Sequence, residues 1–301
     1  MNGNWKSVEE HISQTIGKQI HFKQYANIAG GCINQASKII DSESNQWFIK
    51  TNKSTNLNMF TAESADLNAL REPQAMRVPK SICHGSNNTF SYLVLEYIEL
   101  KPLINQMSAG QALAKMHLYP YEIPAAHPQK RFGWIQNNSI GLTPQSNTPH
   151  DSWVSFWKEE RLLPQLNLAK RKGYSSKDFD NGLKLAESLD HFFTSYSPQA
   201  SLLHGDLWSG NCASDSQGKP VIFDPAVYIG DRESDIAMTE LFGGFSQAFY
   251  DAYNAHFPLA PEYKKRKQLY NLYHILNHFN LFGGGYASQA AKMTKNLLSW
   301  F

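Results

Sequence analysis

The chain has 301 residues, of which 42% are hydrophobic and 18% are charged, and its formal net charge is +2. This length predicts two lobes rather than one small core, and the composition is that of a globular enzyme rather than a disordered chain. The small net charge argues against nucleic acid as a partner, because nucleic-acid-binding domains usually carry a marked basic excess.

The sequence also argues against a membrane or secreted protein. No stretch approaches the ~18 apolar residues that a membrane span needs, and residues 1–14 lack the apolar core of a signal peptide. Cys32, Cys83 and Cys212 are few and widely spaced, which disfavours a disulfide framework or a zinc site. We therefore expect a cytoplasmic protein without a membrane partner.

The first hundred residues read mostly as strands with one prominent helix after the third strand. Helices are predicted at 5–16 and 59–70, and strands at 20–28, 37–40, 46–50 and 91–98. The lobe boundary falls near residues 99–102. We thus predict a small β-rich N-terminal lobe over 1–98 and a larger, mostly helical C-terminal lobe over 99–301.

The second lobe changes to helical patterns, interrupted by a loop rich in Pro, Gly and Asn and by a β-hairpin at about 201–223. Helices are predicted at 108–118, 151–172 and 176–196, and two or three more finish the chain, one of them over 270–281. The expected fold is α+β and bilobal.

The strongest chemical signal is the segment 203–211, Leu-His-Gly-Asp-Leu-Trp-Ser-Gly-Asn. It places Asp206 five residues before Asn211, which is the spacing of a kinase catalytic loop. A carboxylate there can orient a hydroxyl group and receive its proton. An aspartate after glycine is often only a turn residue, but the flanking strands favour the catalytic interpretation. We expect His204 to brace the loop by hydrogen bonds.

A second carboxylate, Asp224, follows the next apolar strand. The turn signal Asp-Ser-Gln-Gly at 215–218 predicts a hairpin in which residues near Asn211 and Phe223 pair. That pairing would bring Asp224 beside Asn211. Oxygen ligands of this kind suit magnesium better than zinc, so we predict a magnesium site made by Asn211 and Asp224.

Upstream residues suggest a nucleotide site. Gly30 and Gly31 lie between two predicted strands, where backbone N–H groups could approach phosphate, although a plain turn is the simpler interpretation. Lys50 ends a strand, and Glu63 lies on an otherwise apolar helical face. Because an unpaired buried carboxylate is costly, we expect Glu63 to pair with Lys50, which would then position phosphates. A solvated glutamate is the alternative.

The strand that ends near the lobe boundary is a candidate for adenine binding. Backbone groups of Glu96 and Ile98 could hydrogen-bond the base there. A plain strand end followed by a linker is the alternative.

These segments resemble the fructosamine kinase family, within the aminoglycoside phosphotransferase-like and protein-kinase-like fold. The most specific similarities are the loop 204–211 and the block that begins Asp-Pro-Ala-Val-Tyr-Ile-Gly-Asp-Arg-Glu-Ser-Asp at 224 and ends at Phe245. A third region comprises 132–134, 140–145 and 153–163. The glycine-rich segment and Lys50 are generic to kinase-like folds.

The resemblance implies an ATP- and Mg²⁺-dependent kinase that phosphorylates the 3-hydroxyl of a ketosamine, free or protein-bound, in deglycation. It makes Asp206 the catalytic base, Asn211 and Asp224 the metal ligands, and Lys50 with Glu63 the phosphate-positioning pair.

The resemblance also suggests residues around the substrate. Trp208 is expected to stack on the sugar, with ordinary packing as the alternative. Asp235 is expected to brace the catalytic loop. Asp231 and Glu233 are expected either to contact the amine side of the substrate or to be surface charges.

Some questions stay open at this point. Relatives often carry an aspartate where this chain has Asn137 or Asn138, which could alter specificity, and Cys32 could be a redox-sensitive thiol or an ordinary turn residue. An aminoglycoside- or choline-type phosphotransferase and an ATP-binding pseudokinase are the alternative functions. The sequence does not decide between a monomer and a weak dimer, or which ketosamine is used.

Overall fold

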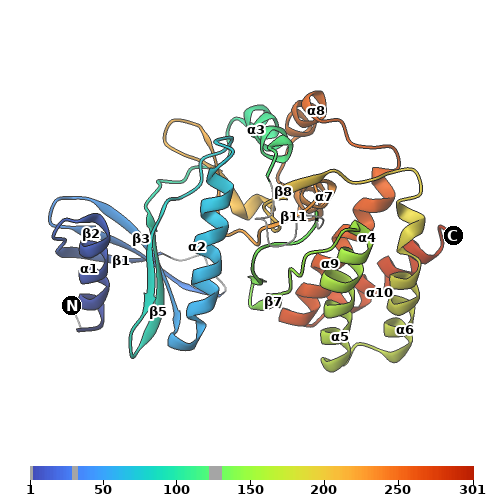
Figure 1. The fold of residues 1–301 in the computed structure, drawn as a ribbon, viewed down its shortest axis with the longest axis horizontal. Coiled ribbons are helices and arrows are strands. Elements are labelled where there is room, and N and C mark those ends of the chain that lie inside the picture. The colour runs from blue at the N-terminus through green and yellow to red at the C-terminus, as the bar shows by residue number, and fades with distance from the viewer. Residues whose placement is uncertain (1–2, 29–32, 122–130) are drawn as a thin grey trace. The chain divides into compact units, whose positions relative to one another are not determined.

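The protein is described from a computed structural model, over residues 3–28, 33–121 and 131–301. The chain divides into two compact units, each built from two segments (Figure 1). The first unit comprises residues 1–104 and 213–224, and the second comprises 105–212 and 225–301. No helix in the described part of the chain is long and apolar enough to cross a membrane.

The first unit contains a five-stranded antiparallel sheet with strand order β1-β2-β3-β5-β4. Its elements are α1 (Gly3–Ile16), β1 (Phe22–Ile28), β2 (Gln35–Asp41), β3 (Gln46–Lys53), a 3-10 turn (Ser54–Asn56), α2 (Leu57–Arg71), β4 (Ser81–Ser86) and β5 (Phe90–Glu96). Strand β4 was not predicted, because its sequence Ser-Ile-Cys-His-Gly-Ser lacks a run of strand-forming residues.

The core of this sheet fixes the direction of Lys50. Val8 and Ile12 of α1 pack in one apolar cluster with Ile39 and Ile49 of the sheet. Successive side chains of a strand point to opposite faces, so Lys50, the residue after Ile49, points away from that cluster. The lysine is therefore directed to the other face of the sheet by the apolar alternation of β3.

The hairpin of β9 (Cys212–Ser214) and β10 (Pro220–Ile222) packs with the first unit, although the predicted boundary at residue 98 assigned it to the second lobe. Backbone hydrogen bonds explain this placement. Lys101 and Ser214 exchange two N–H···O bonds of 2.8 and 2.9 Å. Residue 77 donates its N–H to Pro220 at 2.9 Å and accepts from Ile222 at 3.0 Å.

A side-chain clamp adds to these backbone bonds. The Arg77 guanidinium donates to the carboxylate of Asp215 at 2.8 Å, within the β9–β10 turn, and to that of Glu96 at 2.5 Å, at the end of β5. Asp215 is almost fully buried. The clamp thus joins the end of the candidate adenine strand to the hairpin that leads into Asp224.

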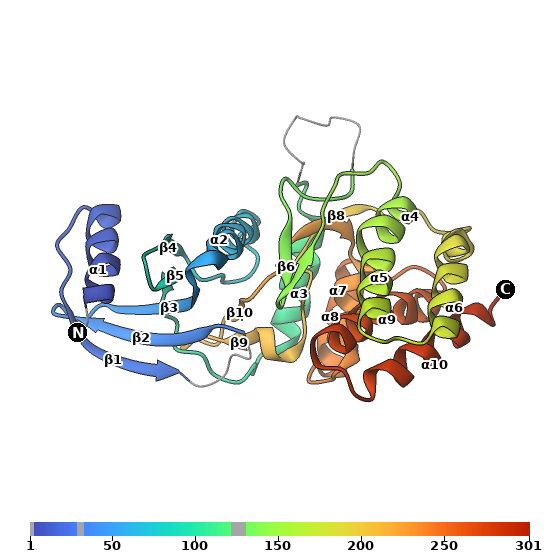
Figure 2. The ribbon, with the colours of Figure 1, turned by 90° about the horizontal axis from the view of Figure 1, so that it is seen from below.

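The second unit is mostly helical. Its elements are α3 (Gln106–Leu118), β6 (Asn138–Ile140), β7 (Thr143–Gln145), α4 (Trp153–Phe156), a π-helical segment (Trp157–Leu162), α5 (Leu163–Arg171), α6 (Ser176–Glu187), 3-10 turns (Leu189–Phe192 and Ser209–Asn211), β8 (Ala200–Leu203), β11 (Tyr228–Asp231), α7 (Glu233–Leu241), α8 (Gln247–His256), α9 (Tyr263–Phe282) and α10 (Tyr286–Leu298). Helix α9 packs against α5, α7 and α10, and α6 lies beside α10 (Figure 2).

The predicted single hairpin over 201–223 is wrong. Strand β8 pairs antiparallel with β11, with Leu203 opposite Tyr228, and the β9–β10 hairpin forms separately between them in the chain. The physical reason is apolar matching. Leu202 and Leu203 are fully buried, and the buried run 226–229 is a better partner for them than the short strands of the hairpin.

The clamp gives a first prediction. Arg77→Met removes the cation between two carboxylates and leaves the Oδ2 atom of the buried Asp215 without the hydrogen bond from Arg77, which is unfavourable. We expect the melting temperature to fall by about 3 °C or more. Arg71→Met, at an exposed position on the last turn of α2, is the matched control and should melt like the wild type. Equal melting of the two variants would show that the clamp does not hold the hairpin.

Candidate functional site

The loop 204–211 is braced internally by its own hydrogen bonds. The Asp206 N–H donates to Nδ1 of His204 at 3.2 Å, so that nitrogen carries no proton. The Trp208 N–H donates to the Asp206 carbonyl at 3.1 Å. Asn211 donates through Nδ2 to the carbonyl of Asp206 at 2.9 Å and to its carboxylate at 3.2 Å. The structure therefore brings Asp206, Asn211 and His204 together within one short loop.

Asp235, in the first turn of α7, fixes the start of this loop by hydrogen bonds to its backbone. Its carboxylate accepts the N–H of His204 at 2.8 Å and that of Gly205 at 2.9 Å. His117 of α3 lies 3.2 Å from the same carboxylate, and its other ring nitrogen lies 2.8 Å from the hydroxyl of Tyr253. Asp235 and His117 are both buried.

The titration of this pair follows from these contacts. Burial opposes the charge of Asp235, but the hydrogen bonds that its carboxylate accepts from His117 and from the Gly205 N–H help to outweigh it, and the pKa of the carboxyl lies below its usual value. Burial lowers the pKa of His117, which favours the neutral ring. A neutral imidazole can donate to Asp235 through one nitrogen and accept from Tyr253 through the other.

Gly205 is required by the backbone at this point. Its φ is +81°, in the left-handed region that favours glycine. A Cβ atom at this position would lie 2.0 Å from the carbonyl oxygen of Ala226, whose N–H donates to the His204 carbonyl at 2.8 Å. The close approach of the two chain segments thus explains the glycine between His204 and Asp206.

Trp208 projects outward from the loop. Its indole ring covers Gly210, where a Cβ atom would lie 2.3 Å from the ring, and it meets Phe242 edge-on at 6.2 Å between ring centroids. It is one of the exposed large aromatic residues of the second unit. An exposed ring with a fixed orientation can stack on a ligand, and that role stays a prediction.

Lys50 in the first unit contacts two carboxylates. Its ammonium group pairs with Glu63 of α2, as expected, and also with Asp224, which the sequence did not indicate. Burial disfavours the charged lysine, but the charges of Asp224 and Glu63 outweigh it and raise the pKa of Lys50. Burial, partly offset by Lys50, raises the pKa of Glu63. Lys50 and Glu63 are nearly enclosed, whereas the Asp224 side chain is 49% exposed.

The backbone at Asp224 is unusual. Its φ is +56°, a left-handed conformation that few residues other than glycine adopt, although aspartate tolerates it better than most. Such a conformation costs roughly 1–3 kcal/mol and is enriched at functional sites, although Ser44, Gln74 and Glu262 also have positive φ values in this chain. It turns the chain sharply just after β10 and directs the carboxylate toward Lys50.

Other predicted nucleotide contacts are less defined. The Glu96 N–H donates to the Lys80 carbonyl at 2.9 Å, so it is used within the sheet, and the Glu96 carboxylate accepts from Arg77. Ile98 is largely buried. Adenine binding by this segment stays a prediction. Gly30, Gly31 and Cys32 lie outside the described residues.

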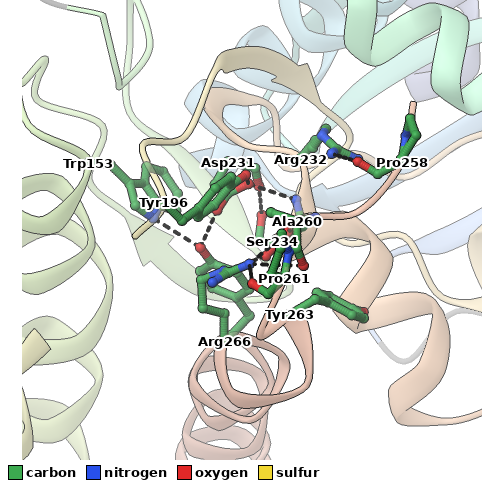
Figure 3. Close-up of polar contacts among 12 residues, drawn as sticks. Trp153, Tyr196, Asp231, Arg232, Ser234, Pro258, Ala260, Pro261, Tyr263 and Arg266 are labelled. Atoms are coloured by element: carbon green, nitrogen blue, oxygen red, sulfur yellow. Dashed lines mark hydrogen bonds and ion pairs between the residues drawn. The ribbon is translucent and has the colours of Figure 1, made fainter. Parts of the chain in front are cut away.

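The expectation that Asp231 and Glu233 are exposed, either to substrate or as surface charges, is wrong. Both residues are fully buried in the second unit. Asp231 accepts a hydrogen bond from the hydroxyl group of Tyr196 at 2.9 Å (Figure 3). It accepts another from the hydroxyl group of Tyr270 at 2.5 Å. Glu233 accepts two hydrogen bonds from Arg266, at 2.6 and 3.1 Å.

The physical reason for this correction is that both carboxylates are used inside the unit. Burial, together with the neighbouring charge of Glu233, raises the pKa of Asp231 to about 6. The sequence offered one signal that we missed: Arg266 and Tyr270 are four residues apart, on one face of a helix, and can meet the same partner region. Through these bonds, Arg266 and Tyr270 join α9 to the end of β11 and the start of α7.

The asparagines that raised the question of specificity also have structural roles. Asn138 is buried, donates to the Val227 carbonyl at 2.9 Å and accepts from Gln145 at 2.9 Å. Asn137 accepts the N–H of Asn147 at 2.9 Å.

The buried Asp235 gives a second prediction. Asp235→Asn places an NH2 group opposite one of the two loop N–H groups, which leaves a buried donor unsatisfied at a cost of about 1–3 kcal/mol. We expect the amides of residues 203–206 to exchange hydrogen about ten-fold faster or more, measured by mass spectrometry. Asp251→Asn, on the exposed face of α8, is the control. Unchanged exchange in the loop would contradict the bracing role.

Comparison with known proteins shows similarity along almost the whole chain. The family model for fructosamine kinase matches residues 4–300. The chain is 45% identical to a probable ketoamine kinase of Synechocystis over 98% of its own length and 97% of the relative's. It is 39% identical to a chloroplastic protein-ribulosamine 3-kinase of Arabidopsis thaliana over 94% of its own length and 85% of the relative's.

Solved structures confirm the predicted protein-kinase-like fold. A Haemophilus somnus protein assigned as a fructosamine-3-kinase aligns with a TM-score of 0.88 and 28% identity, over 98% of both chains. The choline kinase of Streptococcus pneumoniae aligns with a TM-score of 0.66 and 15% identity, over 99% of both chains, which shows the fold alone. With the family model matching almost its whole length, the chain belongs to the fructosamine kinase family.

Proposed function

We propose that this protein is an ATP-dependent kinase that phosphorylates the 3-hydroxyl group of ketosamines. The observation that carries the proposal is the geometry of the catalytic loop. Asn211 holds Asp206 by two hydrogen bonds, and the carboxylate of Asp235 binds the N–H group of Gly205, directly before Asp206. The names of the relatives, ketoamine kinase and ribulosamine 3-kinase, support a sugar-derived amine as the acceptor. Deglycation is the process that such a reaction would serve.

In the proposed reaction the sugar hydroxyl attacks the terminal phosphorus of ATP. A bond forms between that oxygen and phosphorus, the bond to the bridging oxygen breaks, and ADP leaves. Asp206 receives the hydroxyl proton. Lys50, held by Glu63, would neutralise phosphate charge, so the chain contributes mainly orientation and electrostatic stabilisation.

We propose that Asn211 and Asp224 hold Mg²⁺. Their amide and carboxylate oxygens are the donors that this ion prefers. Asn211 directly precedes β9, one residue separates Asp224 from the end of β10, and the two strands pair, which supports the proposal from the course of the chain. When bound, the ion would neutralise the charge that develops on the phosphates.

Two other functions can be tested against this one. A choline- or aminoglycoside-type phosphotransferase shares the fold, but Trp208 and the block after Asp224 resemble the fructosamine kinase family, and this resemblance favours a ketosamine acceptor. A pseudokinase is disfavoured because Lys50, Asp206 and Asn211 are all present.

The proposal predicts the effect of Asp206→Asn. The amide cannot accept the hydroxyl proton, so we expect kcat on ribulosamine or fructosamine to fall by ~100-fold or more, with ATP affinity nearly unchanged. ADP release measures turnover, calorimetry measures ATP binding, and NMR locates the phosphorylated carbon.

The same panel contains choline and an aminoglycoside, and Asp180→Asn on the exposed face of α6 is the matched control. Faster turnover of choline or the aminoglycoside than of either ketosamine would reject the substrate class. Near-normal turnover by Asp206→Asn would remove this residue from its role, and ATP binding without turnover of any acceptor would favour the pseudokinase.

A further inference from the structure

A row of aromatic side chains leads away from the catalytic loop across the second unit. We call Trp208, Phe242, His278 and Phe282 the aromatic row. Successive ring centroids are 6.2, 5.1 and 5.7 Å apart, so each ring touches the next. The members come from the catalytic loop, the end of α7 and the last turns of α9.

The position of Phe242 in this row is fixed by the turn that follows it. Gly243 and Gly244 have φ values of +72° and +99°, and a Cβ atom on Gly244 would lie 2.4 Å from that of Ser209 in the catalytic loop. Gln106 holds the far side, donating to the Gly244 carbonyl at 3.2 Å and accepting the Ser246 N–H at 2.5 Å. The row is therefore built against the loop that carries Asp206.

The row is also open to solvent. Trp208 is 38% exposed, Phe242 42% and Phe282 60%, and His278 between them is half-buried. A contiguous exposed aromatic surface that starts at a functional loop is typical of a ligand or partner contact. Its continuity with Trp208, two residues after Asp206, connects it with the acceptor rather than with an unrelated partner.

A ketosamine has a sugar end and an amine end, and the two ends need different contacts with the protein. The sugar end must reach Asp206 with its hydroxyl group, and the substituted amine must then lead away from that point. The protonated amine is favoured over an aromatic face by cation–π attraction, and an apolar substituent gains free energy by covering exposed rings. The four side chains of the row offer no carboxylate or guanidinium for a charged substituent.

We propose that the aromatic row is the subsite for the nitrogen substituent of the ketosamine, and that it selects apolar or aromatic substituents. This proposal rests on the proposed function and deepens it. Trp208 would lie at the sugar end of the subsite, Phe242 in the middle and Phe282 at its outer end.

The test compares two ribulosamines that differ only in the amine, one made from methylamine and one from phenethylamine. The wild type is expected to have a lower KM for the phenethylamine adduct. In Phe282→Ala the ratio of the two KM values should shift against that adduct by about ten-fold, because a ring contact is lost. Phe242→Leu, which keeps an apolar side chain, should shift the ratio less.

Phe301→Ala is the control, since this exposed phenylalanine lies away from the row and stacks on His191. It should leave the ratio unchanged, and melting curves check that every variant is folded. Turnover of both adducts without discrimination by the wild type, or an unchanged ratio in Phe282→Ala, would overturn this assignment alone. Absence of turnover on both adducts would overturn the proposed function and the assignment with it.

Discussion

One buried carboxylate, that of Asp235, determines the geometry of the candidate catalytic loop. A buried charge is tolerated only when donors surround it, and here His204 and Gly205 supply backbone N–H groups while His117 supplies a ring nitrogen. These bonds connect α3, the loop and α7 around a single point. The N–H groups of His204 and Gly205 both point to Asp235, and the chain must turn sharply before it reaches Asp206. The left-handed conformation of Gly205 provides this turn.

In the first unit, the charges around Lys50 do not balance. One ammonium group, on Lys50, faces the carboxylates of Glu63 and Asp224, which leaves a local excess of negative charge. Glu63 is enclosed by the fold, whereas Asp224 is half exposed at the end of a strained turn. An additional cation would be favoured at the exposed carboxylate, which is the physical argument in support of a metal ligand at Asp224.

The sequence predicted features that depend on residues close together in the chain. It did not predict contacts between residues that are far apart in the chain. The loop 204–211 and the Lys50–Glu63 pair follow from local patterns, namely a strand, a turn and one apolar helical face. The bond from Arg77 to Asp215 joins residues 138 positions apart, and the pairing of β8 with β11 skips a complete hairpin. No periodicity or turn signal encodes such contacts, because they depend on which apolar surfaces meet after folding.

Asp231, Glu233 and Asp235 show how this limit affects functional interpretation. The sequence suggests a substrate or surface position for Asp231 and Glu233 and a bracing position for Asp235, whereas all three are buried and each accepts hydrogen bonds from the protein itself. The block that most clearly identifies the family therefore supports the architecture of the second unit. Selectivity for the acceptor has to come from groups that reach solvent near Asp206, and among the described residues the aromatic row meets that condition while the acidic block does not.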